Sequence, residues 1–203
     1  MASEKDTYKT IATAGEETMF KEKGSKFFGY AFPVTSEEEI RGQLDTLKKE
    51  HYSARHWCYA WQLGKGYERY RVNDDGEPSN SAGAPIYGQI QAFGLTNVLV
   101  VVVRYFGGTK LGVGGLIQAY KTSAKMALEA SRLITRTIDE NFIVQCAYAD
   151  LNSVMRVVKN EQLKIVGQKM EMDCKIEISV RKKDSDRIFD TFRNLQNIQI
   201  RRR

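Results

Sequence analysis

Cysteine, histidine and proline are scarce: this 203-residue chain has three cysteines, two histidines and three prolines. The cysteines at positions 58, 146 and 174 are far apart and odd in number, so they indicate neither a disulfide framework nor a zinc site of CxxC pairs. No apolar run approaches the roughly 20 residues of a membrane helix, and the N-terminal MASEKDTYKT contains no apolar signal segment. We therefore expect a cytoplasmic protein without a membrane partner.

Charge is moderate and evenly spread. The net charge is +6, and only the closing Arg201-Arg202-Arg203 concentrates it. The content of 42% hydrophobic and 28% charged residues is typical of a soluble globular protein. This balance permits a polyanionic partner such as RNA without requiring one.

The first half of the chain predicts a mixture of strands and helices. A helix is expected from a capping box at Ser36 and Glu39 through residue 52, and a short one near 85–93. Strands are expected at 7–13, 26–34, 56–62 and 67–73.

The most apolar stretch, VLVVVV at 98–103, shows no alternation, so both of its faces should be buried in a central strand. After a glycine-rich loop, residues 115–130 have helical spacing. The side chains expected to face inward on this helix are Ile117, Tyr120, Ala124, Ala127 and Leu128.

Residues 131–138 form the expected boundary between two domains, at 1–134 and 138–203. In the second domain the apolar patterns predict strand, helix, two strands, helix and strand. This βαββαβ order is that of the ferredoxin-like fold, which hosts many activities and implies none.

The glycine-rich loop, RYFGGTKLGVGG at 104–115, fails both nucleotide-binding templates. A Walker A loop would need lysine where Val113 stands, and the dinucleotide fingerprint would need glycine where Ile117 stands. The remaining functional interpretation is a helix start whose free backbone N–H groups bind an anion, with Arg104 and Lys110 nearby. The alternative is structural: the glycines allow positive φ and close packing, and Arg104 has an internal ion-pair partner.

The acidic loop NDDGEPSNSAGAP, at 73–85, also allows two interpretations. Asp74, Asp75 and Glu77 are the kind of ligands that magnesium takes, and His56 could assist as a base. The same residues are equally typical of a turn, since Asp tolerates left-handed backbone, Gly supplies positive φ and Pro closes the bend.

Aromatic residues gather on one predicted strand. Trp57, Tyr59 and Trp61 share one face, which could stack nucleic-acid bases but is more often core, and we expect core. Tyr105 and Phe106, at a strand end, are better candidates for exposed aromatic side chains.

Three segments, VVVVRYFGGTKLGVGGLIQAY, NDDGEPSNSAG and ARHWCYAWQLG, closely resemble the Impact/YigZ family. The resemblance implies an α+β protein. Its N-terminal domain would have the ribosomal-protein domain 2-like fold with a left-handed βαβ crossover, followed by a ferredoxin-like domain. Two departures stand out: Asn80-Ser81 replaces the usual Gly-Thr, and Gln118 replaces a usual arginine.

For bacterial members the resemblance implies association with nucleic acid or the ribosome and no established reaction. Eukaryotic relatives regulate translation by binding an activator of a stress kinase through an added domain. We therefore expect a translation-associated protein that binds RNA or the ribosome without catalysis or cofactor. The expected contact residues are Arg104, Tyr105, Gly107, Gly108, Lys110, Gly112, Gly114, Gly115 and Lys121.

Two alternatives stay open. One is a metal-dependent phosphate-ester hydrolase that holds magnesium on Asp74, Asp75 and Glu77. The other is a protein–protein adaptor that uses the ferredoxin-like sheet to bind a translation-related protein.

Overall fold

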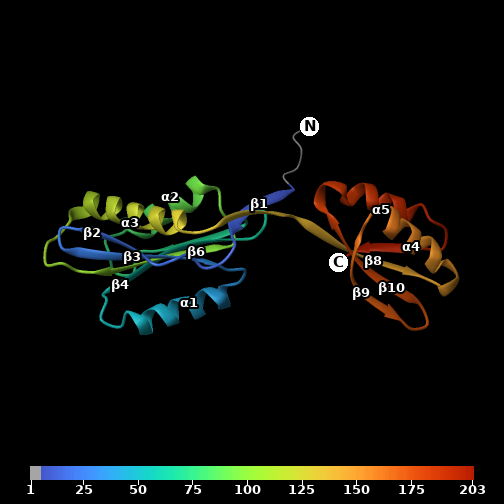
Figure 1. Cartoon of the computed structure of the whole chain (residues 1–203), viewed down its shortest axis with the longest axis horizontal. Helices are drawn as coiled ribbons and strands as arrows, with labels where there is room; N and C mark the ends of the chain where they lie inside the picture. The colour runs from blue at the N-terminus through green and yellow to red at the C-terminus, as the bar shows by residue number, and fades with distance from the viewer. Residues whose placement is uncertain (1–5) are drawn as a thin grey trace. The chain divides into compact units, whose positions relative to one another are not determined.

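The computed structural model describes residues 6–203, which divide into two compact units (Figure 1). One unit comprises residues 8–136, and the other comprises residues 137–203 with Asp6 and Thr7. Residues 1–5, at which the first expected domain begins, lie outside the described residues. Within the described part, no helix is both long and apolar enough to cross a membrane.

The first unit is built on a five-stranded antiparallel sheet with the order β2-β3-β6-β4-β5. The strands are β2 (Thr18–Glu22), β3 (Ser25–Pro33), β4 (His56–Leu63), β5 (Arg69–Asn73) and β6 (Val98–Tyr105). A separate pair joins β1 (Thr7–Ile11) to β7 (Leu133–Thr137). Since β6 is antiparallel to both β3 and β4, these two strands run parallel on either side of it.

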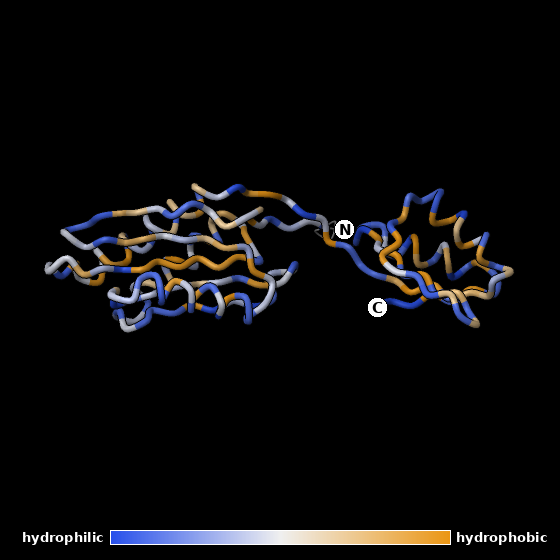
Figure 2. The backbone as a smooth tube through the Cα atoms, turned by 60° about the horizontal axis from the view of Figure 1, so that its bottom comes forward, coloured by the Kyte–Doolittle hydropathy of each residue, from blue (hydrophilic) through white to orange (hydrophobic). Residues whose placement is uncertain are grey.

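Helices cover both faces of this sheet (Figure 1). On one side lies α1 (Glu37–Glu50), and on the other lie α2 (Gly83–Phe93) and α3 (Gly112–Glu129). The central strand supplies both cores: Val98, Val100 and Val102 pack with α2 and α3, and their neighbours pack with α1. This confirms the expected two-sided burial of β6, an apolar run that Figure 2 shows in orange.

The second unit is a four-stranded antiparallel sheet, ordered β11-β8-β10-β9, packed against two helices. Its elements follow the expected βαββαβ order along the chain. They are β8 (Asp139–Cys146), α4 (Leu151–Asn160), β9 (Lys164–Met170), β10 (Cys174–Arg181), α5 (Ser185–Arg193) and β11 (Gln199–Arg202), with single 3-10 turns at 148–150 and 182–184.

Local expectations hold, with corrections at β2, β7, α3 and the cap of α1. The sequence pattern did not predict β2, whose residues alternate only between exposed and half-buried positions, or β7, which lies within the expected boundary at 131–138. Helix α3 begins at Gly112, three residues earlier than expected, and Ile117 points outward with 38% of its surface exposed. Ser36 does cap α1 by accepting from the Glu39 N–H, but the Glu39 carboxylate accepts from the backbone N–H of Thr35, one residue before the box position.

The aromatic stripe on β4 belongs to the core, as expected. Trp61 is 5% exposed, and Trp57 and Tyr59 pack around it in the core beneath α1. These residues are therefore not a stacking surface. They instead place the other face of β4, which carries His56 and Cys58, toward α2 and α3.

Candidate functional site

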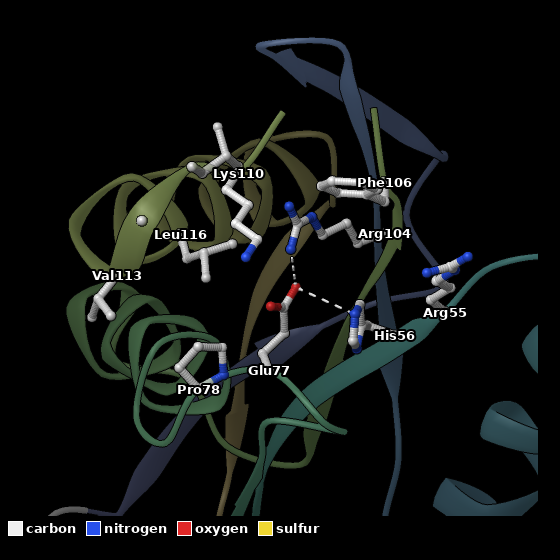
Figure 3. A pocket seen from close by; sticks show the side chains of 11 residues that line it. Arg55, His56, Glu77, Pro78, Arg104, Phe106, Lys110, Val113 and Leu116 are labelled. Carbon is white, nitrogen blue, oxygen red and sulfur yellow. Dashed lines mark hydrogen bonds and ion pairs between the residues drawn. The ribbon is translucent and has the colours of Figure 1, made fainter. Parts of the chain in front are cut away.

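A cavity of about 520 Å³ opens where three segments of the first unit meet (Figure 3). These are the start of β4, the loop after β5, and the glycine-rich connection from β6 into α3. Its lining residues are Arg55, His56, Glu77, Pro78, Arg104, Phe106, Lys110, Leu111, Gly112, Val113 and Leu116.

Glu77 anchors the floor of this cavity and is neutralised from within the protein. Its Oε1 accepts from Arg104 Nη1 at 2.5 Å and from the Tyr120 hydroxyl at 2.7 Å. The Glu77 and Arg104 side chains are 4% and 6% exposed, so the pair is shielded from solvent. Arg104 Nη2 also donates to Ser25 Oγ at 3.4 Å, which fixes the plane of the guanidinium.

His56 flanks the same carboxylate. Its Nδ1 lies 2.8 Å from the backbone carbonyl of Asp75, and because a carbonyl only accepts, this nitrogen carries the proton. The Nε2 atom then faces Glu77 Oε1 at 4.0 Å, as the dashed line in Figure 3 shows. The imidazole is thereby fixed in orientation at the cavity wall.

Two buried acids behind the cavity stay protonated. Burial, together with the neighbouring Cys58 and Glu77, raises the pKa of the Tyr120 phenol far above its usual value, so it remains a donor to Glu77. Burial likewise raises the pKa of the Cys58 thiol, and the nearby carboxylates add to the effect. Because the thiolate is the nucleophilic form of cysteine, Cys58 is not an activated nucleophile.

The acidic loop uses its aspartates to hold the backbone. Asp74 accepts from the N–H groups of Ala82 and Gly83 at 2.9 and 2.8 Å through Oδ1 and from Asn80 N–H at 2.9 Å through Oδ2, so it caps the start of α2. Asp75 accepts from the Trp57 N–H at 2.7 Å and has a left-handed φ of 41°, as its turn role requires.

These residues do not fit a magnesium ion. Asp74 and Glu77 already accept two or three hydrogen bonds each within the protein. Among residues 6–203, no group of three or more His, Cys, Asp or Glu side chains is arranged to hold a metal. The three carboxylates therefore have separate structural roles.

Two cations at the cavity are available to a ligand. In the part of the chain that the structure describes, neither the Arg55 nor the Lys110 side chain has an ion-pair or hydrogen-bond partner, and both residues are exposed. Figure 3 shows Lys110 reaching over the cavity toward Glu77 and Arg104, with Arg55 beyond His56. Adjacent to Lys110, α3 begins after Leu111, an apolar residue whose side chain makes no capping hydrogen bond.

The glycines of the loop have different roles. Gly107 lies against the Gly24–Ser25 turn so closely that an added Cβ would be 1.9 Å from the carbonyl carbon of Gly24. Gly108 and Gly112 adopt positive φ, 86° and 69°. Gly114 has open space around it, and Gly115 meets only the Leu111 side chain. Close packing and backbone conformation thus account for three of the five.

The structure brings together some of the expected contact residues and separates others. Arg104, Lys110 and Gly112 line the cavity with His56 and Glu77. Tyr105 is on the opposite sheet face, where its hydroxyl lies 2.9 Å from His51 Nδ1, and Lys121 is exposed on α3 outside the cavity. The sequence reasoning missed Arg55, Val113 and Leu116. Arg55 immediately precedes His56, a proximity that could have signalled it.

Comparisons with known proteins agree with this architecture. Residues 23–128 match the Impact N-terminal domain. The chain is 30% identical over 191 residues to IMPACT family member YvyE of Bacillus subtilis, covering 94% of this chain and 88% of that protein. It is 32% identical over 147 residues to IMPACT family member YigZ of Escherichia coli, covering 71% and 72%.

A solved structure described as a hypothetical protein superposes on the chain with a TM-score of 0.73 at 24% identity, covering 96% of both chains, and shows the shared fold. The family itself is shown by the match to the Impact N-terminal domain and by the two sequence relatives. The chain belongs to the IMPACT family.

Proposed function

We propose that this chain is a cytoplasmic, non-catalytic, translation-associated protein that binds RNA, free or in the ribosome, and that its cavity receives an RNA phosphate. The observation that carries the proposal is the pairing of two unpartnered cations, Arg55 and Lys110, with the uncapped start of α3 at one cavity.

The charge of the cavity favours an anion. Arg104 and Glu77 cancel each other inside the protein. The charge that faces the solvent is therefore that of Arg55 and Lys110, both positive. The first N–H groups of α3 and the positive end of its dipole add to this potential without a competing acidic side chain in the first turn.

The roles of the groups around the cavity favour binding over catalysis. The Cys58 thiol stays protonated behind the wall, and the aspartates of the acidic loop hold the backbone.

The sheet topologies of the two units agree with the expected folds. The sheet order of the second unit is compatible with a ferredoxin-like fold. The crossover from β3 through α1 to β4, around β6, is compatible with the ribosomal-protein domain 2-like fold, whose left-handed connection stays a prediction.

The test is fluorescence anisotropy of labelled single-stranded RNA titrated with the full chain over a range of salt concentrations. We expect the logarithm of the affinity to fall linearly with the logarithm of the salt concentration, because phosphate binding releases counterions. Lys110→Ala and Arg55→Ala should each weaken binding and reduce the magnitude of the salt slope by about one.

Lys121→Ala is the matched control, because it removes the same charge from the exposed surface of α3 outside the cavity. Equal losses in Lys121→Ala and Lys110→Ala would mean that general surface charge, rather than the cavity, binds RNA. A salt-independent affinity would contradict the proposal, as would the absence of both RNA binding and ribosome co-sedimentation at low salt.

A further inference from the structure

We infer that the cavity accepts one unpaired nucleotide, whose base stacks on Phe106 while its phosphate lies between Lys110 and the start of α3. This inference rests on the proposed function and adds to it the form of RNA that is recognised: an unstacked, unpaired residue in place of a duplex backbone.

Phe106 is a stacking surface held in place from one side. It follows β6 directly, lines the cavity and leaves 44% of its surface exposed. The Arg104 guanidinium carbon lies 5.7 Å from the centroid of its ring. Since Arg104 is itself fixed by Glu77 and Ser25, the aromatic ring rests on a rigid cation.

A phosphate has donors within the same cavity. Lys110 offers an unpartnered ammonium, and α3 offers its first N–H groups beside Gly112, which has no side chain to obstruct them. Arg104 does not compete for this role, because its two terminal nitrogens already donate to Glu77 and Ser25.

The opposite wall is apolar and completes the site. Pro78, Val113 and Leu116 face the Glu77–Arg104 pair across the cavity (Figure 3). An apolar wall, an aromatic face and a few directed polar groups are the usual composition of a pocket for one small ligand, and about 520 Å³ lies in the range of such pockets. A paired base has no free face to offer and must first leave the helical stack.

The experiment compares four competitors against a labelled single-stranded RNA bound to the full chain. The first two are the unlabelled single strand and the same sequence as a blunt duplex. The third is adenosine monophosphate, and the fourth is an equimolar mixture of adenosine and inorganic phosphate. We expect the single strand to compete about tenfold better than the duplex. The monophosphate should compete better than either of its components.

Phe106→Ala should weaken single-strand binding about tenfold. It should leave the weaker duplex binding unchanged, and Phe106→Trp should restore single-strand affinity. Tyr52→Ala is the matched control, since Tyr52 is an 83%-exposed aromatic residue of the same unit that does not line the cavity. Thermal unfolding of each variant separates loss of binding from loss of fold.

The outcomes distinguish this inference from the proposed function. If Phe106→Ala has no effect, or if the duplex competes as well as the single strand while Lys110→Ala still weakens binding, the stacking inference is wrong and phosphate binding at the cavity stands. If neither Phe106→Ala nor Lys110→Ala weakens binding, both are wrong.

Discussion

At the scale of single residues, the main lesson concerns Arg104. From the sequence it is a cation at the end of a buried strand beside a glycine loop, and both an anion site and an internal ion pair are consistent with that position. In the structure, Arg104 forms a buried ion pair with Glu77, which is 27 residues earlier in the chain. The cations left for a ligand are Arg55 and Lys110, and no local pattern in the sequence distinguishes a paired arginine from an unpaired one.

Removing the Glu77 charge should therefore destabilise the first unit strongly. Glu77→Gln leaves the Arg104 charge buried without compensation, and we expect a loss of about 3 kcal/mol in the free energy of unfolding. Denaturant unfolding followed by tryptophan fluorescence measures this directly, because both tryptophans are on β4.

The control for that variant is Glu129→Gln, which breaks the exposed Lys125–Glu129 ion pair. Exposed pairs contribute little, so its loss should stay below about 0.5 kcal/mol. Similar stabilities for Glu77→Gln and Glu129→Gln would mean that the Glu77–Arg104 pair is not buried in solution.

At the scale of elements, the connection from β6 to α3 determines the shape of the site. Its glycines resemble a ligand loop, yet Gly107 is there because the turn at Gly24 and Ser25 lies directly against it. Packing is one of the two roles that the sequence leaves open for these glycines. The sequence could not show which glycine packs, because the contact joins segments more than 80 residues apart.

Gly107→Ala and Gly114→Ala should accordingly change stability in opposite directions. An alanine Cβ at 107 would overlap backbone atoms of the neighbouring turn, and we expect a loss of about 2 kcal/mol. At 114, within helix α3 and with open space around it, alanine should raise stability by about 0.5 kcal/mol. Thermal melts of the two variants test this, and a loss in Gly114→Ala equal to that in Gly107→Ala would contradict it.

The acidic loop provides a second test at this scale. Asp74→Ala removes a carboxylate that three backbone N–H groups share at the start of α2, so we expect a loss of about 2 kcal/mol. The loss should be the same with and without magnesium, because the role is capping. A stabilising shift of the wild-type melting temperature by magnesium that Asp74→Ala abolishes would instead support a metal site.

At the scale of the whole molecule, much of the architecture could be predicted from the sequence. The alternation in β4, the uniform apolarity of β6 and the βαββαβ order all follow from burial patterns that single segments carry. What the sequence could not supply is the meeting of residues 55–56, 77–78 and 104–116 at one cavity, since it depends on β4 and β6 pairing side by side. Strand β2 was not predicted for a different reason: no position in this strand is fully buried, so its sequence lacks a clear apolar pattern.

Because the Cys58 thiol is buried, we expect the first unit to lose stability at alkaline pH. Cysteine in the unfolded chain has a pKa of about 8.5 and is half deprotonated at that pH, whereas burial raises the pKa of Cys58 in the folded state so that the thiol stays protonated. The stabilisation is therefore complete below about pH 8.5 and declines as the pH rises. Between pH 9 and 10, Cys58→Ala should make the slope of the unfolding free energy shallower by about 1 kcal/mol per pH unit. An identical slope in the variant would mean that Cys58 is solvated.

We propose the cavity between β4, β6 and α3 as the place where RNA binds. The most direct measurement is a titration of the ¹⁵N-labelled full chain with a short single-stranded RNA, followed by backbone amide chemical shifts at low salt. We expect the perturbed amides to cluster at residues 55–56, 77–78 and 104–116, with Phe106 and Lys110 among the largest changes. Perturbations confined to residues 137–203, or spread evenly over the basic surface of both units, would contradict the account.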